Sequence, residues 1–183
     1  MSNTALSVTL ANLALIGALP WVFFTREQRR FGVLWFVTAA PFALAAGCLL
    51  LGAGGVLRPA WRATEPLGAL LSAGSLALIG LTAGVHRRPL ALWHQQHDAP
   101  QGIVQCGPYS RVRHPFYSAF LLALAGAACV LPHVATLLIL LAGAALLSWT
   151  ARREERRLCA SPFGADYAAY MLRTGRFLPR RSA

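Results

Sequence analysis

Hydrophobic residues fall in long blocks along this chain, separated by short polar segments that are rich in arginine. Five blocks can be read, at residues 4–24, 31–57, 66–85, 116–131 and 134–150. A helix needs about 20 residues to cross about 30 Å of hydrocarbon. The pattern therefore predicts an all-α integral membrane protein with about five transmembrane helices.

Prolines and glycines mark the breaks in this pattern. Pro41 is predicted to interrupt the second block, which ends in the Gly-Ala-Gly-Gly run at 52–55. Pro132 removes a backbone donor and is predicted to end the fourth helix. Because the fourth block is short and the fifth follows at once, the last two helices are predicted to form a tight hairpin.

The segment after Thr150 is too polar to span a membrane. In it Phe163, Tyr167 and Tyr170 recur at helical spacing, which predicts a short cytosolic helix that lies on the membrane or packs over the polar segment before the fourth block. No linker divides the chain, so residues 1–183 are predicted to form a single membrane domain. Residues 1–85 would supply three N-terminal transmembrane helices, and residues 86–183 a polar loop, the hairpin and the tail.

Charge supports the membrane interpretation and gives it an orientation. Only 13% of residues are charged, against about 25% in a typical soluble domain. All 17 basic residues are arginines, and 15 of them lie in alternate polar segments or in the tail. Because basic loops stay in the cytosol, the N-terminus is predicted outside and the C-terminus inside. The Ala-, Leu- and Arg-rich composition without lysine favours a bacterial inner membrane, and the lack of arginine before Arg26 argues against a cleaved signal peptide.

The net charge of +11 could suggest binding to nucleic acid, but the positions of the arginines favour another partner. Arginines at the edges of membrane helices attract anionic lipid headgroups, by about 1 kcal/mol each. Membrane lipids are therefore expected partners, and nucleic acid is not. The four cysteines form no Cys-x-x-Cys pair and no spacing typical of zinc, so no metal site is predicted.

One polar stretch directly before the fourth block is chemically unusual. It reads Gly-Pro-Tyr-Ser-Arg-Val-Arg-His-Pro-Phe-Tyr at 107–117, and after the hairpin come Glu154-Glu155 and Phe-Gly-Ala-Asp-Tyr-Ala-Ala-Tyr at 163–170. Each part has an ordinary explanation: a turn, arginines that reach headgroups, an aromatic belt and a salt-bridged helix face. However, a carboxylate where a helix leaves the membrane is costly unless it is paired or useful.

The ordered set resembles the isoprenylcysteine carboxyl methyltransferase family and, more widely, the phospholipid-methyltransferase-like integral membrane methyltransferases. The matching positions are Gly107, Tyr109, residues 113–117, Glu154, Glu155, Leu158, residues 163–170 and residues 176–179. The resemblance covers roughly residues 93–179, whereas the first three helices match only as hydrophobic segments.

This resemblance implies an S-adenosylmethionine-dependent methyltransferase at the cytosolic membrane edge. The acceptor would be a lipophilic small molecule or a lipid with a carboxylate, thiol or amine. His114 and Glu155 would be catalytic, as bases for an amine acceptor. The implied contacts of the S-adenosylmethionine cofactor, with residues 86–115 as the binding loop, are His94, Gln101, Gly102, Ile103, Val104, Tyr109, His114, Pro115, Phe116, Tyr117 and Glu154.

The chemistry of these residues agrees with such a ligand. The helix that begins at Pro115 would hold the cofactor carboxylate at its positive end, and the faces of Tyr109 and Tyr117 would meet its sulfonium. However, Thr150 stands where prenylcysteine enzymes have an arginine, which puts a prenylcysteine substrate in doubt. Two alternatives stay open: a non-catalytic membrane protein with this scaffold, such as an assembly or stress factor, and a reductase-like relative, although no Gly-x-Gly-x-x-Gly is present.

Overall fold

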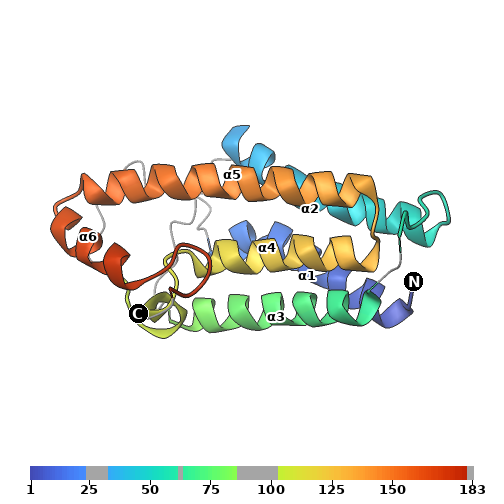
Figure 1. Ribbon diagram of the computed structural model, residues 1–183, viewed down its shortest axis with the longest axis horizontal. Coiled ribbons are helices and arrows are strands. Elements are labelled where there is room, and N and C mark those ends of the chain that lie inside the picture. Colours follow the sequence, from blue (N-terminus) through green and yellow to red (C-terminus); the bar gives the residue numbers. More distant parts are fainter. Residues whose placement is uncertain (24–32, 62–63, 86–102, 181–183) are drawn as a thin grey trace.

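The computed structural model describes residues 1–23, 33–61, 64–85 and 103–180, which fold almost entirely as helices (Figure 1). These ranges contain six α-helices, one short 3₁₀ helix and no named strand. The elements are α1 (Asn3–Phe23), α2 (Val33–Ala53), α3 (Glu65–Gly84), η1 (Gly107–Ser110), α4 (Pro115–Val130), α5 (Val134–Cys159) and α6 (Gly164–Arg173). The all-α prediction is confirmed. Each long helix begins close to the start of its predicted block, but α5 continues past residue 150, where its apolar block ends, to Cys159.

The five long helices lie along one another, and α6 folds back from the end of α5 (Figure 1). Helix α4 is the central one, since it contacts α1, α2, α3 and α5. Its residues Ala119, Phe120, Ala123 and Leu124 are buried. The shortest of the long helices is therefore the one around which the others pack.

Small residues let α3 and α4 approach closely. A Cβ atom added to Gly126 would stand 2.5 Å from Ser72 Oγ and 3.0 Å from the Gly68 carbonyl oxygen. Interfaces between membrane helices are enriched in small residues for this reason, because the attraction there comes from packing and not from water. The α3–α4 contact thus depends on two glycines that face each other.

A buried polar network joins α1 to α3 and α4 inside the apolar bundle. Thr9 Oγ1 lies 2.9 Å from Ser72 Oγ, and Asn12 Nδ2 donates to the Ser72 carbonyl at 3.2 Å. Ser75 Oγ donates to the Ala119 carbonyl at 2.7 Å. Such hydrogen bonds hold membrane helices in a fixed register, because each buried polar group needs its partner.

The predicted helical hairpin is confirmed, with its turn at residues 131–133. The Ala135 N–H donates to His133 Nδ1 at 3.1 Å, and the His133 N–H donates to Thr136 Oγ1 at 3.2 Å. These bonds satisfy backbone donors at the start of α5. The Ala60 N–H also donates to the Pro132 carbonyl at 2.8 Å, which ties the α2–α3 connection to the turn.

The predicted break at Pro41 is wrong. Helix α2 continues through this proline from Val33 to Ala53. Proline is tolerated in helices of membrane proteins where neighbouring helices and local adjustments compensate for the lost hydrogen bond. Here Gly143 of α5 lies opposite Pro41. A Cβ atom added to Gly143 would stand 3.7 Å from Pro41 Cβ, which is an ordinary van der Waals distance.

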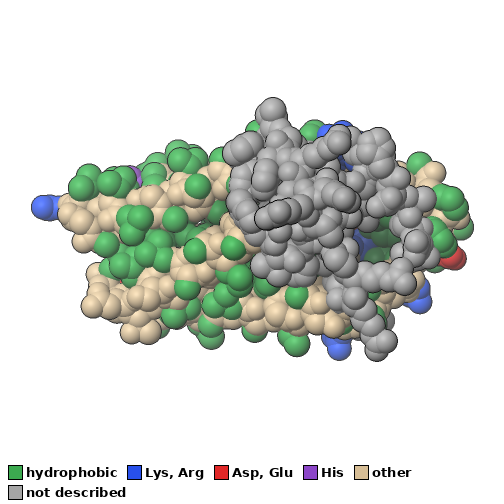
Figure 2. Space-filling view, turned by 180° about the vertical axis from the view of Figure 1, so that it is seen from behind, with side chains coloured by type: hydrophobic (Ala, Val, Ile, Leu, Met, Phe, Trp, Pro, Cys, Tyr) green, Lys and Arg blue, Asp and Glu red, His purple; other side chains and the backbone are tan. Residues whose placement is uncertain are grey.

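Helices α3 and α5 are each long and apolar enough to cross a membrane. The other apolar stretches, Asn3–Leu19, Val37–Ala53 and Pro115–Val130, are shorter. Hydrophobic side chains spread along the visible described face, with basic side chains at its left end and in its right part (Figure 2). Length and composition thus support a membrane protein, whereas five crossings are not shown.

Candidate functional site

The start of α4 and the end of α5 meet at one end of the bundle, because the two helices form an antiparallel hairpin. His114 is the residue that precedes α4, and Pro115 opens the helix, a position where its missing N–H costs nothing. Glu154 and Glu155 lie near the end of α5. The residues that gather here, Arg113, His114, Tyr117, Glu154, Glu155 and Arg176, are called the polar cluster below.

Within the polar cluster, the stacked rings of His114 and Tyr117 lie against Glu154. The rings of His114 and Tyr117 are parallel, with centroids 5.2 Å apart, and Phe177 meets both of them edge-on. The Tyr117 hydroxyl donates to Glu154 Oε1 at 2.7 Å, and His114 Nδ1 lies 3.5 Å from Glu154 Oε2. Tyr117 and Glu154, which were both expected to contact one cofactor, therefore meet at one end of the bundle.

Glu155 is a buried carboxylate, with 7% of its side chain exposed, and two arginines neutralise it. Arg113 Nε donates to Glu155 Oε1 at 2.9 Å, and Arg176 Nη2 donates to Oε2 at 2.5 Å. His114 Nε2 lies 3.3 Å from Oε1 but makes no hydrogen bond. A carboxylate buried in this way needs such partners, because burial removes it from water and only a nearby positive charge offsets the lost hydration.

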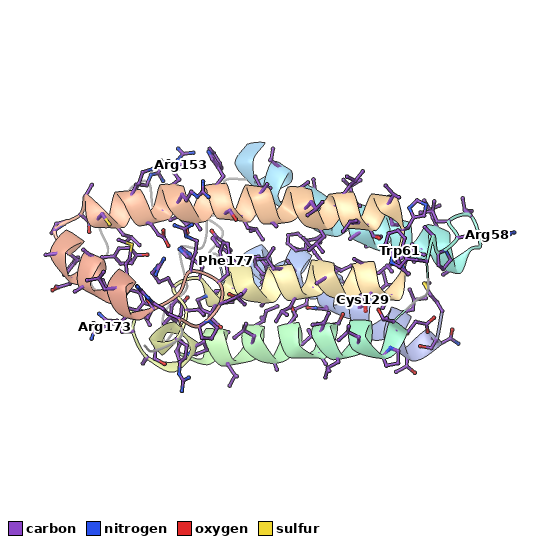
Figure 3. All side chains as sticks on the ribbon, in the orientation of Figure 1. Arg58, Trp61, Cys129, Arg153, Arg173 and Phe177 are labelled. Atoms are coloured by element: carbon purple, nitrogen blue, oxygen red, sulfur yellow. The ribbon has the colours of Figure 1, made fainter. Side chains whose placement is uncertain are left out.

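Residues 174–177, called the C-terminal clasp here, bind to the backbone around the start of α4. The Arg113 N–H donates to the Gly175 carbonyl at 2.8 Å, and the His114 N–H donates to the Arg176 carbonyl at 3.1 Å. Ser118 Oγ donates to the Phe177 carbonyl at 2.7 Å. Figure 3 shows Phe177 between the ribbons of α4 and α5. The clasp thus closes this end of the hairpin from the outside.

Helix α6 and Arg113 hold the clasp in place. The Tyr170 hydroxyl donates to the Tyr109 carbonyl at 2.6 Å. Arg113 Nη1 donates to the Met171 carbonyl at 3.2 Å and also to the Thr174 carbonyl. Because Tyr170 is buried, α6 packs over the polar segment, which was one of the two predicted arrangements.

Two glycines permit this path of the backbone. Gly107 has a φ of 58°, which a residue with a side chain rarely adopts. A Cβ on Gly175 would collide with the Leu178 carbonyl. The turn into η1 and the turn that begins at Gly175 within the clasp therefore both require glycine.

Burial and ion pairing fix the protonation states around the clasp. Burial raises the pKa of Tyr109, and it raises the pKa of Tyr170 to about 12 against the opposing effect of Arg113. Hydrogen bonds to Glu155 raise the pKa of the Arg176 guanidinium. The tyrosines therefore remain neutral near pH 7, so that Tyr170 keeps its donor hydrogen, and Arg176 stays charged.

An open groove of about 320 Å³ runs beside α6. Its lining residues are Ile103, Gln105, Phe163, Asp166, Ala169 and Arg173. Arg173 Nη2 donates to Gln105 Oε1 at 3.3 Å, which links the two sides. Of the predicted cofactor-binding residues that the structure describes, Ile103 alone lines this groove, and Tyr117 and Glu154 do not.

The structure brings part of the predicted site together. His114, Tyr117 and Glu154 are in contact, and Pro115 and Phe116 are buried beside them. Val104 is 38% exposed. His94, Gln101 and Gly102 lie outside the described residues. The His114 N–H at the start of α4, where the cofactor carboxylate was expected, donates to Arg176. Binding of S-adenosylmethionine by these residues, and catalysis by His114 and Glu155, stay predictions.

Sequence reasoning missed the partners of Glu155. Arg113 was expected to reach lipid headgroups, and Arg176 was noted only as part of a closing motif. A usable signal was present, since a carboxylate at the end of an apolar helix needs a cation nearby. Within the described residues no three His, Cys, Asp or Glu side chains are grouped so that they could hold a metal ion.

Comparison with known proteins gives one informative relationship. The chain is 33% identical over 160 residues to the cobalt-zinc-cadmium resistance protein CzcN of Cupriavidus metallidurans. The alignment covers 87% of this chain and 67% of that protein. No model of a known protein family matches the sequence.

This relationship corrects the family assignment made from the motifs. The resemblance to isoprenylcysteine carboxyl methyltransferases is wrong, and with it the assignments as a methyltransferase, as a transferase and as an enzyme of methyl transfer, because the relative is a metal-resistance protein. The same motif residues have a structural role here. Glu155 accepts hydrogen bonds from Arg113 and from Arg176, and the second of these bonds holds the C-terminal clasp against α5. The chain belongs to the family of the cobalt-zinc-cadmium resistance protein CzcN.

Proposed function

We propose that this chain is an integral membrane protein that contributes to resistance against divalent transition-metal ions. The observation that carries the proposal is the 33% identity over 160 residues to a cobalt-zinc-cadmium resistance protein. Among the interpretations left open by the sequence, a membrane protein that acts in a stress response agrees with this relative. The polar cluster is the proposed functional site.

The electrostatics of the polar cluster favour an indirect action on metal tolerance. Its two carboxylates already face two arginines and a histidine. Further arginines lie at the same end of the chain's fold, at positions 152, 153, 156, 157, 173 and 180. A free divalent cation is repelled by such a region. The proposed partner is therefore a lipophilic small molecule or a lipid, and S-adenosylmethionine is kept only as a candidate ligand.

The proposal includes a topology. All five long helices cross the bacterial inner membrane, with the N-terminus outside and the polar cluster on the cytosolic side. The excess of arginine around the polar cluster supports this orientation, because basic segments remain in the cytosol. Within the described residues Arg58 lies at the opposite end of the bundle (Figure 3).

The test of the function is growth under metal stress. The gene is deleted in its host, and minimal inhibitory concentrations of zinc, cobalt and cadmium are measured, with magnesium as a control. We expect a loss of tolerance of at least about twofold for one or more transition metals, restored by the wild-type gene. Unchanged tolerance for all three metals would show that the proposal is wrong.

The part played by the polar cluster is tested in the same strain. Complementation with Glu154→Gln removes one charge and keeps the side-chain shape, whereas Leu178→Ala changes a side chain that is 78% exposed and serves as the matched control. We expect the first variant to restore less tolerance than the second at equal membrane levels. Full restoration by Glu154→Gln would reject this site and leave the resistance function standing.

A further inference from the structure

One exposed stripe of α5 changes its chemistry along the helix. Leu138, Leu141, Ala145, Trp149 and Arg152 are all exposed and follow one another at intervals of three or four residues. Residues at these intervals share one face of a helix. With a rise of 1.5 Å per residue, the stripe runs from leucine to arginine over about 21 Å. Trp149 lies between the apolar and the basic part of the stripe, and tryptophan is enriched at the membrane–water interface of membrane proteins.

Three arginines form the polar end of this stripe. Arg152 and Arg156 are exposed, and the guanidinium of Arg153 lies 5.6 Å from the centre of the Trp149 ring. Figure 3 shows Arg153 on the side of α5 that faces away from α4. Within the described part of the chain, none of these three arginines forms an ion pair.

The carboxylates of the same helical turns do not neutralise this face. Glu155 is engaged on the inner side by Arg113 and Arg176. Glu154 accepts a hydrogen bond from Tyr117. The outer face of the last turns of α5 is therefore positive, and it continues directly into an apolar surface.

We propose that Arg152, Arg153 and Arg156 form a binding surface for the headgroup of an anionic phospholipid. Guanidinium groups bind phosphate oxygens through paired hydrogen bonds, which favours arginine over a simple point charge. The acyl chains would lie along Leu138 and Ala145, and the phosphate would meet the arginines beyond Trp149. The order of apolar, interfacial and basic positions along one stripe matches the order of groups in a phospholipid. A nucleic acid lacks the apolar part, so it does not match this surface.

The experiment measures lipid binding to the full chain in detergent by native mass spectrometry. Phosphatidylglycerol is titrated against phosphatidylcholine, and apparent dissociation constants are compared. We expect the wild-type chain to prefer phosphatidylglycerol. Each Arg→Gln change at these positions should weaken its binding about fivefold, and Arg152→Gln/Arg153→Gln/Arg156→Gln about a hundredfold. Binding of phosphatidylcholine should change little.

Two further variants serve as controls, one for the position of the arginine and one for its charge. Arg58→Gln removes one exposed arginine at the opposite end of the bundle and should leave phosphatidylglycerol binding unchanged. Arg153→Lys keeps the charge but loses the paired hydrogen bonds, so it should bind phosphatidylglycerol more weakly than the wild type and more tightly than Arg153→Gln. Thermal unfolding of each variant checks that it is folded. Equal affinity for the two lipids, or a triple variant that binds like the wild type, would overturn the proposal. So would competition by inorganic phosphate or an oligonucleotide at concentrations similar to that of the lipid.

Discussion

Glu155 is the residue on which the closed end of the hairpin depends. Its carboxylate is buried, and both of its oxygens accept hydrogen bonds from arginines. Arg113 in turn reaches the Met171 carbonyl, so that one ion pair connects α5, the start of α4 and the end of α6. Removal of one partner from a buried pair is costly, because it leaves the other charge without compensation.

We predict that Glu155→Gln destabilises the folded protein by about 3 kcal/mol, since two guanidinium groups lose their counter-charge. The measurement is denaturant unfolding in detergent, followed by circular dichroism. Glu154→Gln is the matched control. It keeps an acceptor for Tyr117 and should cost about 1 kcal/mol or less. An equal loss of stability in the two variants would contradict this account of Glu155.

At this scale the sequence indicated which residues matter but not what they contact. His114, Tyr117 and Glu154 were named together from a motif, and they do meet. That Glu155 needs a cation nearby was predictable, but which arginines supply it was not, because they lie 42 residues before it and 21 residues after it in the chain. Their positions depend on how the chain folds back after α6, which no local pattern specifies.

Among the helices, the α3–α4 contact is the one most sensitive to side-chain size. We predict that Gly126→Ala destabilises the protein by about 1–3 kcal/mol, since its Cβ would stand 2.5 Å from Ser72 Oγ. Thermal unfolding in detergent measures the effect. Gly74→Ala on α3 is the control, because no atom lies within 4 Å of its added Cβ. This change should be neutral or stabilising, as alanine is the better helix former. A Gly126→Ala protein as stable as the control would refute the close contact.

Helix positions were the most predictable feature, because each long apolar block is enough to specify a helix. Pro41 was misjudged for a physical reason. The cost of a proline inside a helix depends on how neighbouring helices and local adjustments compensate for the lost hydrogen bond, and α2 continues through Pro41 while packed against α5. The spacing of Tyr167 and Tyr170 predicted α6 correctly. Its place over the polar segment follows from the Tyr170 hydrogen bond to Tyr109, which sequence alone does not reveal.

For the whole molecule, the distribution of arginine predicts its orientation in the membrane. We expect green fluorescent protein fused after residue 183 to fluoresce, because it folds in the cytosol. Alkaline phosphatase inserted after Arg58 should be active, because that enzyme requires the periplasm. The physical reason is the retention of basic segments on the cytosolic side. The reverse pattern of activities would contradict both the orientation and the cytosolic position of the polar cluster.

The C-terminal clasp has a consequence for biosynthesis. Arg176 follows Glu155 by 21 residues, so the ribosome has made all five long helices before it makes the second guanidinium that neutralises this carboxylate. Until the clasp has docked, the carboxylate of Glu155 at the end of the apolar helix lacks one of its two guanidinium partners. A chain that stops early, between α5 and the clasp, keeps that defect permanently. Its folded state would be less stable than that of the full chain, although its hydrophobic segments are complete.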